Sequence, residues 1–425
     1  MQTPFLRSRI HRLRPSATLA INERSSELVQ AGRTVYRLGF GQSPFPVPAA
    51  VVAALQQAAF IKDYLPVQGL PELRQAVARF NRSTLGMDCQ AEHVLIGPGS
   101  KELIYHVQLA LDADLLLPSP SWVSYEPQAQ LAGQAVHWLD TTEAKGWKLD
   151  PDALAQAASH QPKRRKLLIL NYPNNPTGTS YTRAELVALA EVARQQQIVV
   201  LADEIYGELH HQGQHHSMAQ YYPEGTLISS GLSKWCGAGG WRLGTMSFPS
   251  ELDWLLRAMC VIASETFTSV SAPVQHAAVA AFNGGPEIRQ YIHNSRRILA
   301  AVAQYVYRAL VALRVSCPPA DGGFYLFPNF AAYREALAKR GISTSSAMCE
   351  YFLQEWGIAL LPGSAFGRPV EELTARLSFV DFDGAAALES LLSEPEQVPD
   401  QAWIQQHCPR MVAAMEALRS GLGSL

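Results

Sequence analysis

One lysine and one arginine lie eight positions apart in the glycine-rich segment SSGLSKWCGAGGWRLG, residues 229–244. The amine of Lys234 can attack a carbonyl compound covalently if burial and nearby cations lower its pKa. The forked donors of Arg242 suit a phosphate group, and the glycines between the two residues let the chain double back. A solvated surface loop is the competing interpretation, and for a lysine taken alone it is the favoured one.

Two further polar segments could bind an anion or a polar ligand. GPGSKEL places Gly99, Ser100 and Lys101 at the turn from an expected strand into an expected helix. Backbone N–H groups and the helix dipole form an anion seat at such a turn, although an ordinary tight turn remains the simpler interpretation. NYPNNPTG, residues 171–178, is dense in turn-forming residues and holds Asn175 between prolines.

An apolar strand in LADEIYGEL ends in Asp203, with Tyr206 one turn further on. A carboxylate at a buried strand end is costly unless a cation or a protonated nitrogen pairs with it. Asp203 therefore predicts a cationic partner, and a protonated ring nitrogen would serve.

Short apolar runs precede all of these segments and alternate with helical patterns. The expected strands are VLIG, DLLLPS, AVHWLD, KLLIL, IVVLAD and TLISS, between residues 94 and 230. Thr182 and Glu185 form a capping box at the start of one intervening helix. Strands that are apolar throughout and separated by helices predict an α/β fold, with a mostly parallel sheet covered by helices. Ligands gather at the carboxyl ends of such strands, so the polar segments should converge on one edge.

The pattern changes near residue 286, where a long amphipathic helix begins and expected strands GFYLFPNF and ARLSFV follow. We therefore expect a large domain over residues 46–285 and a smaller α+β domain over residues 286–425, closed by a helix in QAWIQQHCPRMVAAMEAL. Residues 1–45 show no such alternation and are expected to pack on the small domain or on a partner subunit.

Composition narrows the class of protein. The chain has 425 residues, 48% of them hydrophobic, and a formal charge of −2, which excludes global disorder and a polyanion-binding role as the main function. Its six cysteines show no metal-binding or disulfide spacing, and no apolar run reaches the length of a membrane span. The N-terminal segment lacks the apolar core of a signal peptide, so a soluble cytoplasmic protein without metal is expected.

NYPNNPTG, DEIY and SKWCGAGGWRLG, in that order and spacing, resemble the fold-type I, pyridoxal phosphate (PLP)-dependent aminotransferases of class I/II, which include aspartate aminotransferase. GFGQSPFPVP, KDYLPVQGLPELRQAVARF, SPSWVSY, LLPGSAFG and ARLSFV extend the resemblance over residues 36–390. The resemblance implies a large PLP-binding domain, a smaller α+β domain and a homodimer with shared sites.

The resemblance also implies a role for individual residues. Lys234 would form the internal aldimine and shuttle a proton. The reaction would be a ping-pong transfer of an amino group between an L-amino acid and a 2-oxo acid. Asp203 would hold the pyridinium nitrogen, and Tyr206 and Asn175 the ring's phenolic oxygen. The other implied contacts to cofactor or substrate involve Gly41, Tyr64 of the neighbouring subunit, Gly99, Ser100, Lys101, Trp122, Ser233, Arg242 and, on the substrate carboxylate, Arg376.

Three features depart from the resemblance or lie outside it. Gly231 stands where many relatives carry a phosphate-binding serine, and VIASETFTSV has no cation for a second substrate carboxylate, so strict dicarboxylate specificity is not expected. Glu265 in that segment could bind a cationic side chain, but a solvated glutamate is favoured. The histidines in residues 210–216 are expected to form a surface loop rather than a metal site.

Two alternatives remain open. The same scaffold supports other PLP reactions, namely β-elimination, cyclisation and amino-acid oxidation. Some transcription regulators carry an aminotransferase-like domain, but they need a DNA-binding domain, and no basic extension of that size precedes residue 36 in this sequence.

Overall fold

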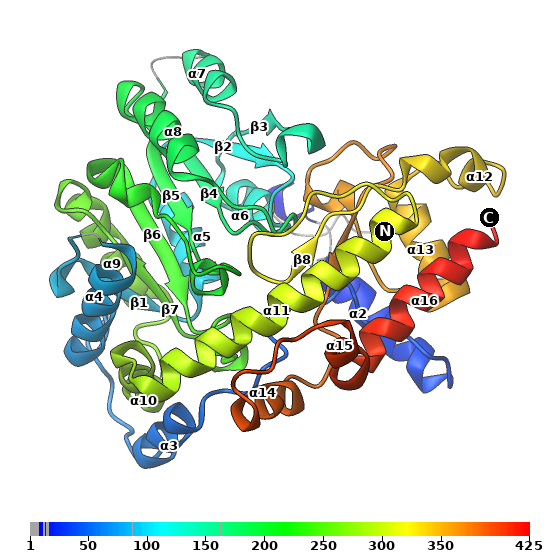
Figure 1. The fold of residues 1–425 in the computed structure, drawn as a ribbon. Helices are drawn as coiled ribbons and strands as arrows, with labels where there is room; N and C mark the ends of the chain where they lie inside the picture. Colours follow the sequence, from blue (N-terminus) through cyan, green and yellow to red (C-terminus); the bar gives the residue numbers. More distant parts are fainter. Residues whose placement is uncertain (1–7, 12, 14–16, 87, 161–163) are drawn as a thin grey trace, which may run out of the picture.

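The computed structural model describes residues 8–425 apart from residues 12, 14–16, 87 and 161–163. Its centre is a seven-stranded sheet in the order β1-β7-β6-β5-β4-β2-β3 (Figure 1). The strands are β1 (Val94–Gly97), β2 (Asp114–Ser119), β3 (Val136–Asp140), β4 (Lys166–Asn171), β5 (Val199–Asp203), β6 (Thr226–Gly231) and β7 (Gly244–Ser247). All pairings are parallel except the two that β7 makes, so the mostly parallel sheet predicted from the sequence is confirmed.

The sequence did not predict β7. Its four residues, GTMS, carry no apolar run, and they follow the arginine segment directly. β7 lies antiparallel between β6 and β1, with Gly231 opposite Gly244 and Ile96 opposite Thr245. The chain therefore turns back after Lys234, and this turn brings Arg242 to the same sheet edge as the lysine.

Helices cover both faces of this sheet, because the side chains that alternate along each strand are apolar on both faces. Leu115 and Leu117 of β2 pack in a cluster with α5 (Ser100–Ala110), α6 (Tyr125–Ala132) and α9 (Asp253–Thr266). Leu116 packs on the opposite face with α7 (Pro151–Ser159) and α8 (Arg183–Gln195). Figure 1 shows α7 and α8 together on one side of the sheet.

The predicted capping box starts α8. The Thr182 hydroxyl accepts from the Glu185 backbone N–H at 3.3 Å, and the Glu185 carboxylate accepts from the Thr182 N–H at 2.7 Å. These two bonds satisfy donors that have no partner within the helix, which fixes where the helix begins.

A second unit is built on a small antiparallel sheet in the order β8-β10-β9. Its strands are β8 (Tyr325–Leu326), β9 (Leu361–Pro362) and β10 (Ala375–Ser378). The helices around it and at the lower end of the large sheet are α3 (Ala49–Ala58), α4 (Pro71–Leu85), α10 (Ala272–Asn283), α11 (Pro286–Ala312), α12 (Arg334–Ala338), α13 (Ser345–Trp356), α14 (Gly384–Ser393), α15 (Gln401–His407) and α16 (Pro409–Gly423).

Two expectations for this unit were wrong in detail. The strand expected over GFYLFPNF shrinks to two residues, because Pro328 has no N–H to continue a ladder. The single closing helix expected over residues 401–418 is two helices, and it breaks at Cys408 because Pro409 begins α16.

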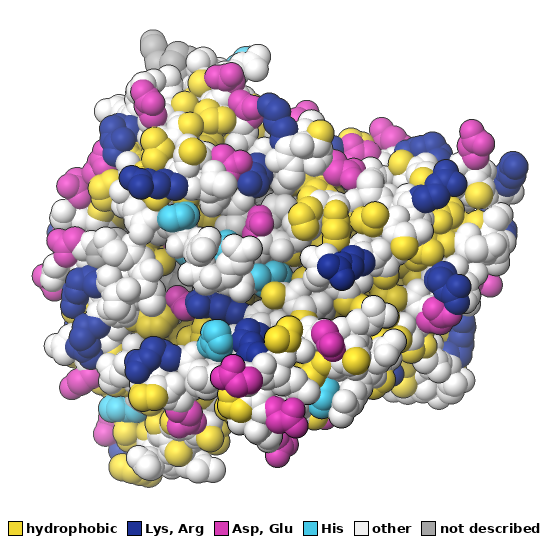
Figure 2. All heavy atoms as spheres, viewed as in Figure 1, with side chains coloured by type: hydrophobic (Ala, Val, Ile, Leu, Met, Phe, Trp, Pro, Cys, Tyr) yellow, Lys and Arg dark blue, Asp and Glu magenta, His cyan; other side chains and the backbone are white. Residues whose placement is uncertain are grey.

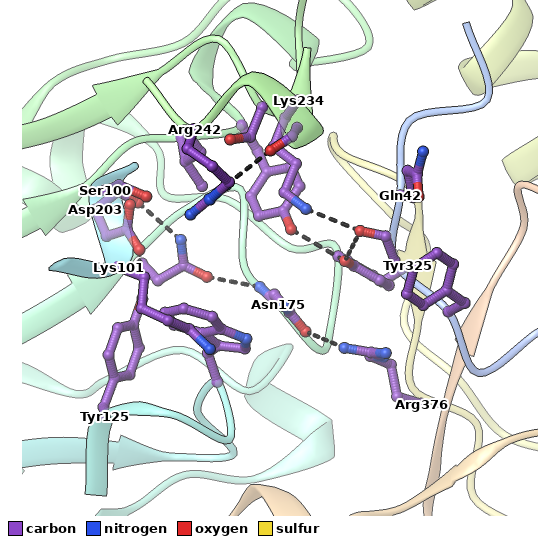
Figure 3. Close-up of a pocket in the computed structure, with 18 of the residues that line it drawn as sticks. Gln42, Ser100, Lys101, Tyr125, Asn175, Asp203, Lys234, Arg242, Tyr325 and Arg376 are labelled. Atoms are coloured by element: carbon purple, nitrogen blue, oxygen red, sulfur yellow. Dashed lines mark hydrogen bonds between the residues drawn. The ribbon is translucent and has the colours of Figure 1, made fainter. Parts of the chain in front are cut away.

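Residues 33–38 lie against the second unit. Tyr36 forms a bridge with Ile358, and the Arg37 N–H donates to Asp381 at 3.0 Å. The preceding helix α2 (Ala17–Gln30) contacts β9. Residues 40–42 follow residues 33–38 closely and lie at the edge of the large sheet, where Figure 3 labels Gln42.

Backbone hydrogen bonds attach the second unit to the sheet edge just ahead of β8. The N–H groups of Asp321 and Gly322 both donate to the Gly178 carbonyl, at 2.8 and 3.1 Å. Gly323 N–H donates to Leu209 O at 3.0 Å, and His211 N–H donates to Asp321 O at 2.8 Å. Segment 321–323 is therefore fixed to the loops that follow β4 and β5.

Among the described residues, no helix is long and apolar enough to cross a membrane. All six cysteines lie in the described part of the chain and are free thiols. On the face shown in Figure 2, basic and acidic side chains are interspersed, so neither charge forms a continuous area there.

Candidate active site

A cavity of about 350 Å³ opens at the carboxyl edge of the large sheet, where the second unit and the N-terminal segment meet it (Figure 3). Most of the residues singled out from the sequence line it: Gly41, Ser100, Lys101, Trp122, Asn175, Asp203, Tyr206, Ser233, Lys234, Arg242 and Arg376. The structure adds Phe40, Gln42, Tyr125, Asn171, Ile205, Gly239, Gly240 and Tyr325. The expected convergence of polar segments on one sheet edge is thus observed.

Lys234 projects into the cavity from the turn after β6. Its Nζ donates to the carbonyl of Gly41 at 2.8 Å and lies 5.6 Å from the centre of the Tyr206 ring. Desolvation, followed by the positive charge of Arg376, lowers the pKa of this amine to about 8. A larger fraction of the amine is therefore neutral and nucleophilic near neutral pH than for an ordinary lysine.

Asp203, the last residue of β5, is 3% exposed. Its Oδ2 accepts from the Tyr125 hydroxyl at 2.6 Å, whereas its buried Oδ1 has no partner among the described residues. Burial is the main reason that the pKa of this carboxyl rises to about 6, and the Tyr125 hydrogen bond opposes the rise. A donor on a ligand in the cavity would satisfy this buried carboxylate oxygen.

Asn171 and Asn175 line the cavity beside Asp203. Asn171 lies opposite Asp203 in the β4–β5 ladder, and its amide donates to the Asp203 carbonyl at 2.7 Å. Its side-chain oxygen accepts from the Asn175 N–H at 2.7 Å. This pair of hydrogen bonds holds the asparagine turn against the end of β5.

Arg376 of β10 reaches the cavity from the opposite side and is 2% exposed. It donates to Asn175 Oδ1 at 3.0 Å and to the Gly39 carbonyl at 2.6 Å, and its Nε has no partner among the described residues. The guanidinium lies 4.7 Å from the Tyr325 ring centre. Burial lowers its pKa, so an anionic ligand that pairs with it would relieve an existing cost.

The start of α5 and Arg242 form one anion seat. Gly99 is the N-cap residue at φ +91°, and a Cβ there would lie 2.1 Å from Arg242 Nη2, so only glycine lets the guanidinium approach the helix start. Arg242 donates to the carbonyls of Gly239 and Pro98 at 2.7 and 3.4 Å. The Lys101 amine lies 5.0 Å from the Trp122 ring centre, and desolvation and Arg242 lower its pKa.

The cavity has an excess of positive charge. Lys101, Lys234, Arg242 and Arg376 all line it, and Asp203 is its one acidic lining residue. Within the part of the chain that the structure describes, none of these four cations forms an ion pair with a carboxylate. A ligand that carries two anionic groups, a ring or amide donor for Asp203 and a group reactive toward an amine would match this arrangement.

Gly231 is explained by packing rather than by ligand chemistry. A Cβ at this position would lie 2.6 Å from the Leu243 carbonyl oxygen and 2.9 Å from the Gly244 Cα. The close packing of β6 against β7 therefore leaves no room for a serine at position 231. The same two strands support the turn that carries Lys234.

Serine at position 231 should destabilise the protein. We expect Gly231→Ser to lower the free energy of unfolding by about 1–3 kcal/mol, because strand backbone cannot move aside as a side chain can. Gly240→Ser is the matched control, since a Cβ at Gly240 meets nothing within 4 Å. Urea unfolding of both variants checks this, and equal stability of the two would contradict it.

Two of the predicted site residues do not line the cavity. Gly99 is the N-cap residue of α5 and lies beside the guanidinium of Arg242, which lines the cavity. Tyr64 is 88% exposed on the surface of the single chain, and the resemblance implies that it belongs to a neighbouring subunit's site. Glu265 is exposed in the last turn of α9 and is absent from the lining of the cavity, as the favoured interpretation expected.

The histidine segment lies at the surface, where residues 212–214 are exposed, but the rings of His211 and His215 turn inward. The side chain of His215 is 7% exposed, and its Nε2 lies 2.9 Å from the carboxylate of buried Glu204. His211 Nε2 lies 3.0 Å from the Gly323 carbonyl, and burial lowers the pKa of His211. Buried acceptors turn these rings inward. Among the described residues, no group of three or more histidine, cysteine, aspartate or glutamate side chains is arranged to hold a metal ion.

The comparisons with known proteins agree on one family. The family described as aminotransferase class I and II matches residues 33–383. The chain is 34% identical over 403 residues to an aspartate aminotransferase of Geobacillus stearothermophilus, covering 92% of this chain and 98% of the relative. It is 33% identical to an aspartate/prephenate aminotransferase of Cereibacter sphaeroides, covering 85% of this chain and 92% of that relative.

Solved structures show the same likeness. The fold matches an aspartate aminotransferase of Thermus thermophilus with maleate at a TM-score of 0.82 and 28% identity, over 92% of this chain and 98% of that one.

Proposed function

The chain belongs to the aminotransferase class I and II family and is a transaminase, and we propose that it uses pyridoxal phosphate held covalently by Lys234. The observation that carries the proposal is the buried Asp203 Oδ1, which lacks a partner among the described residues and lies in a cavity with four cations. A pyridinium N–H would satisfy this oxygen, and a phosphate would satisfy the anion seat at the start of α5. The residues present therefore fit the cofactor.

Each contact to the cofactor follows from the position of a side chain. When bound, the cofactor supplies an electron sink that stabilises negative charge at the substrate's α-carbon. Asp203 would keep the ring nitrogen protonated, helped by the Tyr125 hydroxyl that fixes its other oxygen. Tyr206 and Asn175 would donate to the ring's phenolic oxygen, and Trp122 would contact the face of the ring. The phosphate would be held by Gly99, Ser100, Lys101, Ser233 and Arg242.

Lys234 would act twice, first as the covalent anchor and then as the base that moves a proton between the substrate's α-carbon and the cofactor's C4′. Its lowered pKa supports the second role, because an amine with a pKa of about 8 can both accept and release a proton near neutral pH. We propose a ping-pong reaction, in which the first amino acid would give up its amino group and leave as an oxo acid before the second oxo acid binds.

Arg376 would bind the α-carboxylate of the substrate, since its buried Nε has no partner in the described part of the chain. Gly41 would lie beside the substrate. A Cβ there would come within 1.9 Å of the Tyr325 hydroxyl, so the close approach of the two segments requires glycine. We propose L-amino acids and 2-oxo acids as substrates without strict dicarboxylate preference, because residues 261–270 carry no cation.

We propose a homodimer as the working form, with Tyr64 reaching the phosphate in the partner's cavity. The supporting observation is that Tyr64 and nearby Phe60 are 88% and 81% exposed in the single chain, an unusual exposure for large apolar rings. We also propose the domain limits 46–285 and 286–425, with residues 1–45 on the smaller domain, and a cytoplasmic location in keeping with six free thiols.

A single-turnover experiment tests the reaction. The purified holoenzyme is mixed with one amino acid and no oxo acid acceptor, over a panel of aspartate, glutamate, phenylalanine and lysine. We expect at most one oxo acid per active site, with the cofactor left in its aminated form.

β-Elimination, cyclisation and oxidation are not favoured by the comparisons. Repeated release of ammonia without an acceptor would overturn the proposed transfer in favour of elimination or oxidation. A cyclic product from the amino acid would overturn it in favour of cyclisation.

A further inference from the structure

We propose that Tyr325 is a positioning residue that couples the bonding state of Lys234 to the direction in which Tyr206 donates its proton. The inference rests on the proposed function, because it concerns the covalent attachment of the cofactor to Lys234. No residue motif in the sequence drew attention to Tyr325, and its position is set by the fold.

Four polar groups from different parts of the chain meet at this point. The Tyr325 hydroxyl of β8 lies 3.0 Å from the Tyr206 hydroxyl, which follows β5, and 3.5 Å from the Gly41 carbonyl. The same carbonyl accepts from Lys234 Nζ at 2.8 Å. Figure 3 draws dashed lines for these contacts beside the labelled Lys234 and Tyr325. Tyr325 is 1% exposed and Tyr206 is 3% exposed.

The hydrogen bond donated by Tyr325 can switch between two acceptors. Tyr325 has one hydroxyl proton and two acceptors within reach, the Tyr206 oxygen and the Gly41 carbonyl. While the lysine amine is free, it donates to the Gly41 carbonyl at 2.8 Å. Tyr325 lies 3.5 Å from that carbonyl oxygen but 3.0 Å from the Tyr206 oxygen, so Tyr325 donates to Tyr206. The single proton of Tyr206 is then directed into the cavity.

Attachment of the cofactor changes this count. A nitrogen that has condensed with a carbonyl compound keeps at most one proton, so the donor to Gly41 is lost or weakened. Tyr325 Oη lies 3.5 Å from the Gly41 carbonyl oxygen, so it can replace the lysine as the donor there. Tyr325 then donates to Gly41 and accepts from Tyr206, which draws the Tyr206 proton away from the ring's phenolic oxygen.

The consequence is that Tyr206 donates most strongly to the ring when Lys234 is free, which is when the substrate occupies the cofactor. A donor at the phenolic oxygen stabilises its anionic form. Tyr206 should therefore lower the pKa of the lysine-linked nitrogen. Tyr325 should weaken that effect in the enzyme without substrate.

The test is a pH titration of the cofactor's absorbance in holoenzyme without substrate. In Tyr325→Phe, Tyr206 keeps only the ring oxygen as acceptor, so we expect the titration midpoint to fall by about 0.5–1 pH unit, equivalent to one hydrogen bond. Tyr206→Phe should raise the midpoint, and Tyr325→Phe should then have no further effect. The other titratable or charged groups that face Lys234 and Tyr206 are unchanged in these variants: Lys101 of α5, Tyr125 of α6, Asp203 of β5, Arg242 and Arg376 of β10.

Tyr333→Phe is the matched control, because it removes one hydroxyl that donates to Leu313 O at 2.7 Å away from the cavity. Its midpoint should equal that of the unaltered enzyme. An unchanged or raised midpoint in Tyr325→Phe, or an equal shift in the Tyr206→Phe background, would overturn the inference and leave the proposed function intact. Absence of any lysine-linked absorbance in the unaltered protein would refute the proposed function and the inference together.

Discussion

Replacing Lys234 by alanine should abolish transamination and the covalent attachment of the cofactor. We expect kcat to fall by about 10⁴-fold or more, since the residue is both the anchor and the base that moves the proton. The measurement pairs steady-state kinetics with borohydride reduction and mass spectrometry, which should find the cofactor's mass on the peptide containing residue 234 in the unaltered enzyme alone.

The control for this variant is Lys148→Ala, which removes a lysine that pairs with Glu185 at 3.0 Å outside the cavity. It should keep both activity and the reduced adduct. A Lys234→Ala protein that retained a lysine-linked absorbance would show that another amine is the anchor. Lys101 would then be the first to examine, since it also lines the cavity and burial lowers its pKa.

Asp203→Asn should have opposite effects on activity and on stability. Activity should fall by roughly 10³-fold, because a neutral amide does not keep the ring nitrogen protonated through charge. In protein stripped of cofactor, the same change should raise the free energy of unfolding at pH 7–8 by roughly 1–3 kcal/mol, because the variant no longer buries a carboxylate.

The pH dependence follows from the raised pKa. Burial raises the pKa of the Asp203 carboxyl from 3.8 to about 6 in the folded protein. Its contribution to stability is therefore fully present below about pH 4 and is lost as the pH rises through 6. The gain in the asparagine variant should vanish at low pH, which urea unfolding across this range can measure. Asp140→Asn alters an exposed carboxylate at the end of β3 and should show no such gain.

The sequence predicted those parts of the site that lie at the ends of long apolar strands. β4, β5 and β6 are fully or almost fully buried, so their apolar runs mark where each strand ends and which polar residue follows. Asp203 could be identified in this way. Lys234 also needed the other segments, because a single lysine in a glycine-rich turn is more often exposed.

Residues supplied by tertiary approach could not be found in the same way. Tyr325 lies on a two-residue strand and meets Gly41 across 284 positions of sequence, so no local pattern reports the contact. Arg376 was identified by resemblance alone. Tyr125 could have been identified from the sequence, because it lies only three residues after Trp122. In the structure it begins α6, and its ring meets the Trp122 ring edge-on at 5.2 Å.

The histidine loop shows a different limit. The sequence predicted a surface loop, but composition does not reveal an acceptor elsewhere in the fold toward which one of its rings turns. Glu204 is 4% exposed and accepts from the hydroxyls of Tyr172 and Ser217 as well as facing His215. The ring turns inward because this buried carboxylate is there to receive it.

The attachment of segment 321–323 to the sheet edge has a mechanical consequence. Its hydrogen bonds to Gly178, Leu209 and His211 join main-chain atoms. A Cβ at Gly322 would lie 2.9 Å from the His210 Cα, so this close approach of the two main chains requires glycine. Tyr325 follows two residues after this segment, so these main-chain bonds fix it relative to the loops after β4 and β5. Arg376 of β10 is instead held at the cavity by its own side chain, through Asn175 Oδ1 and the Gly39 carbonyl.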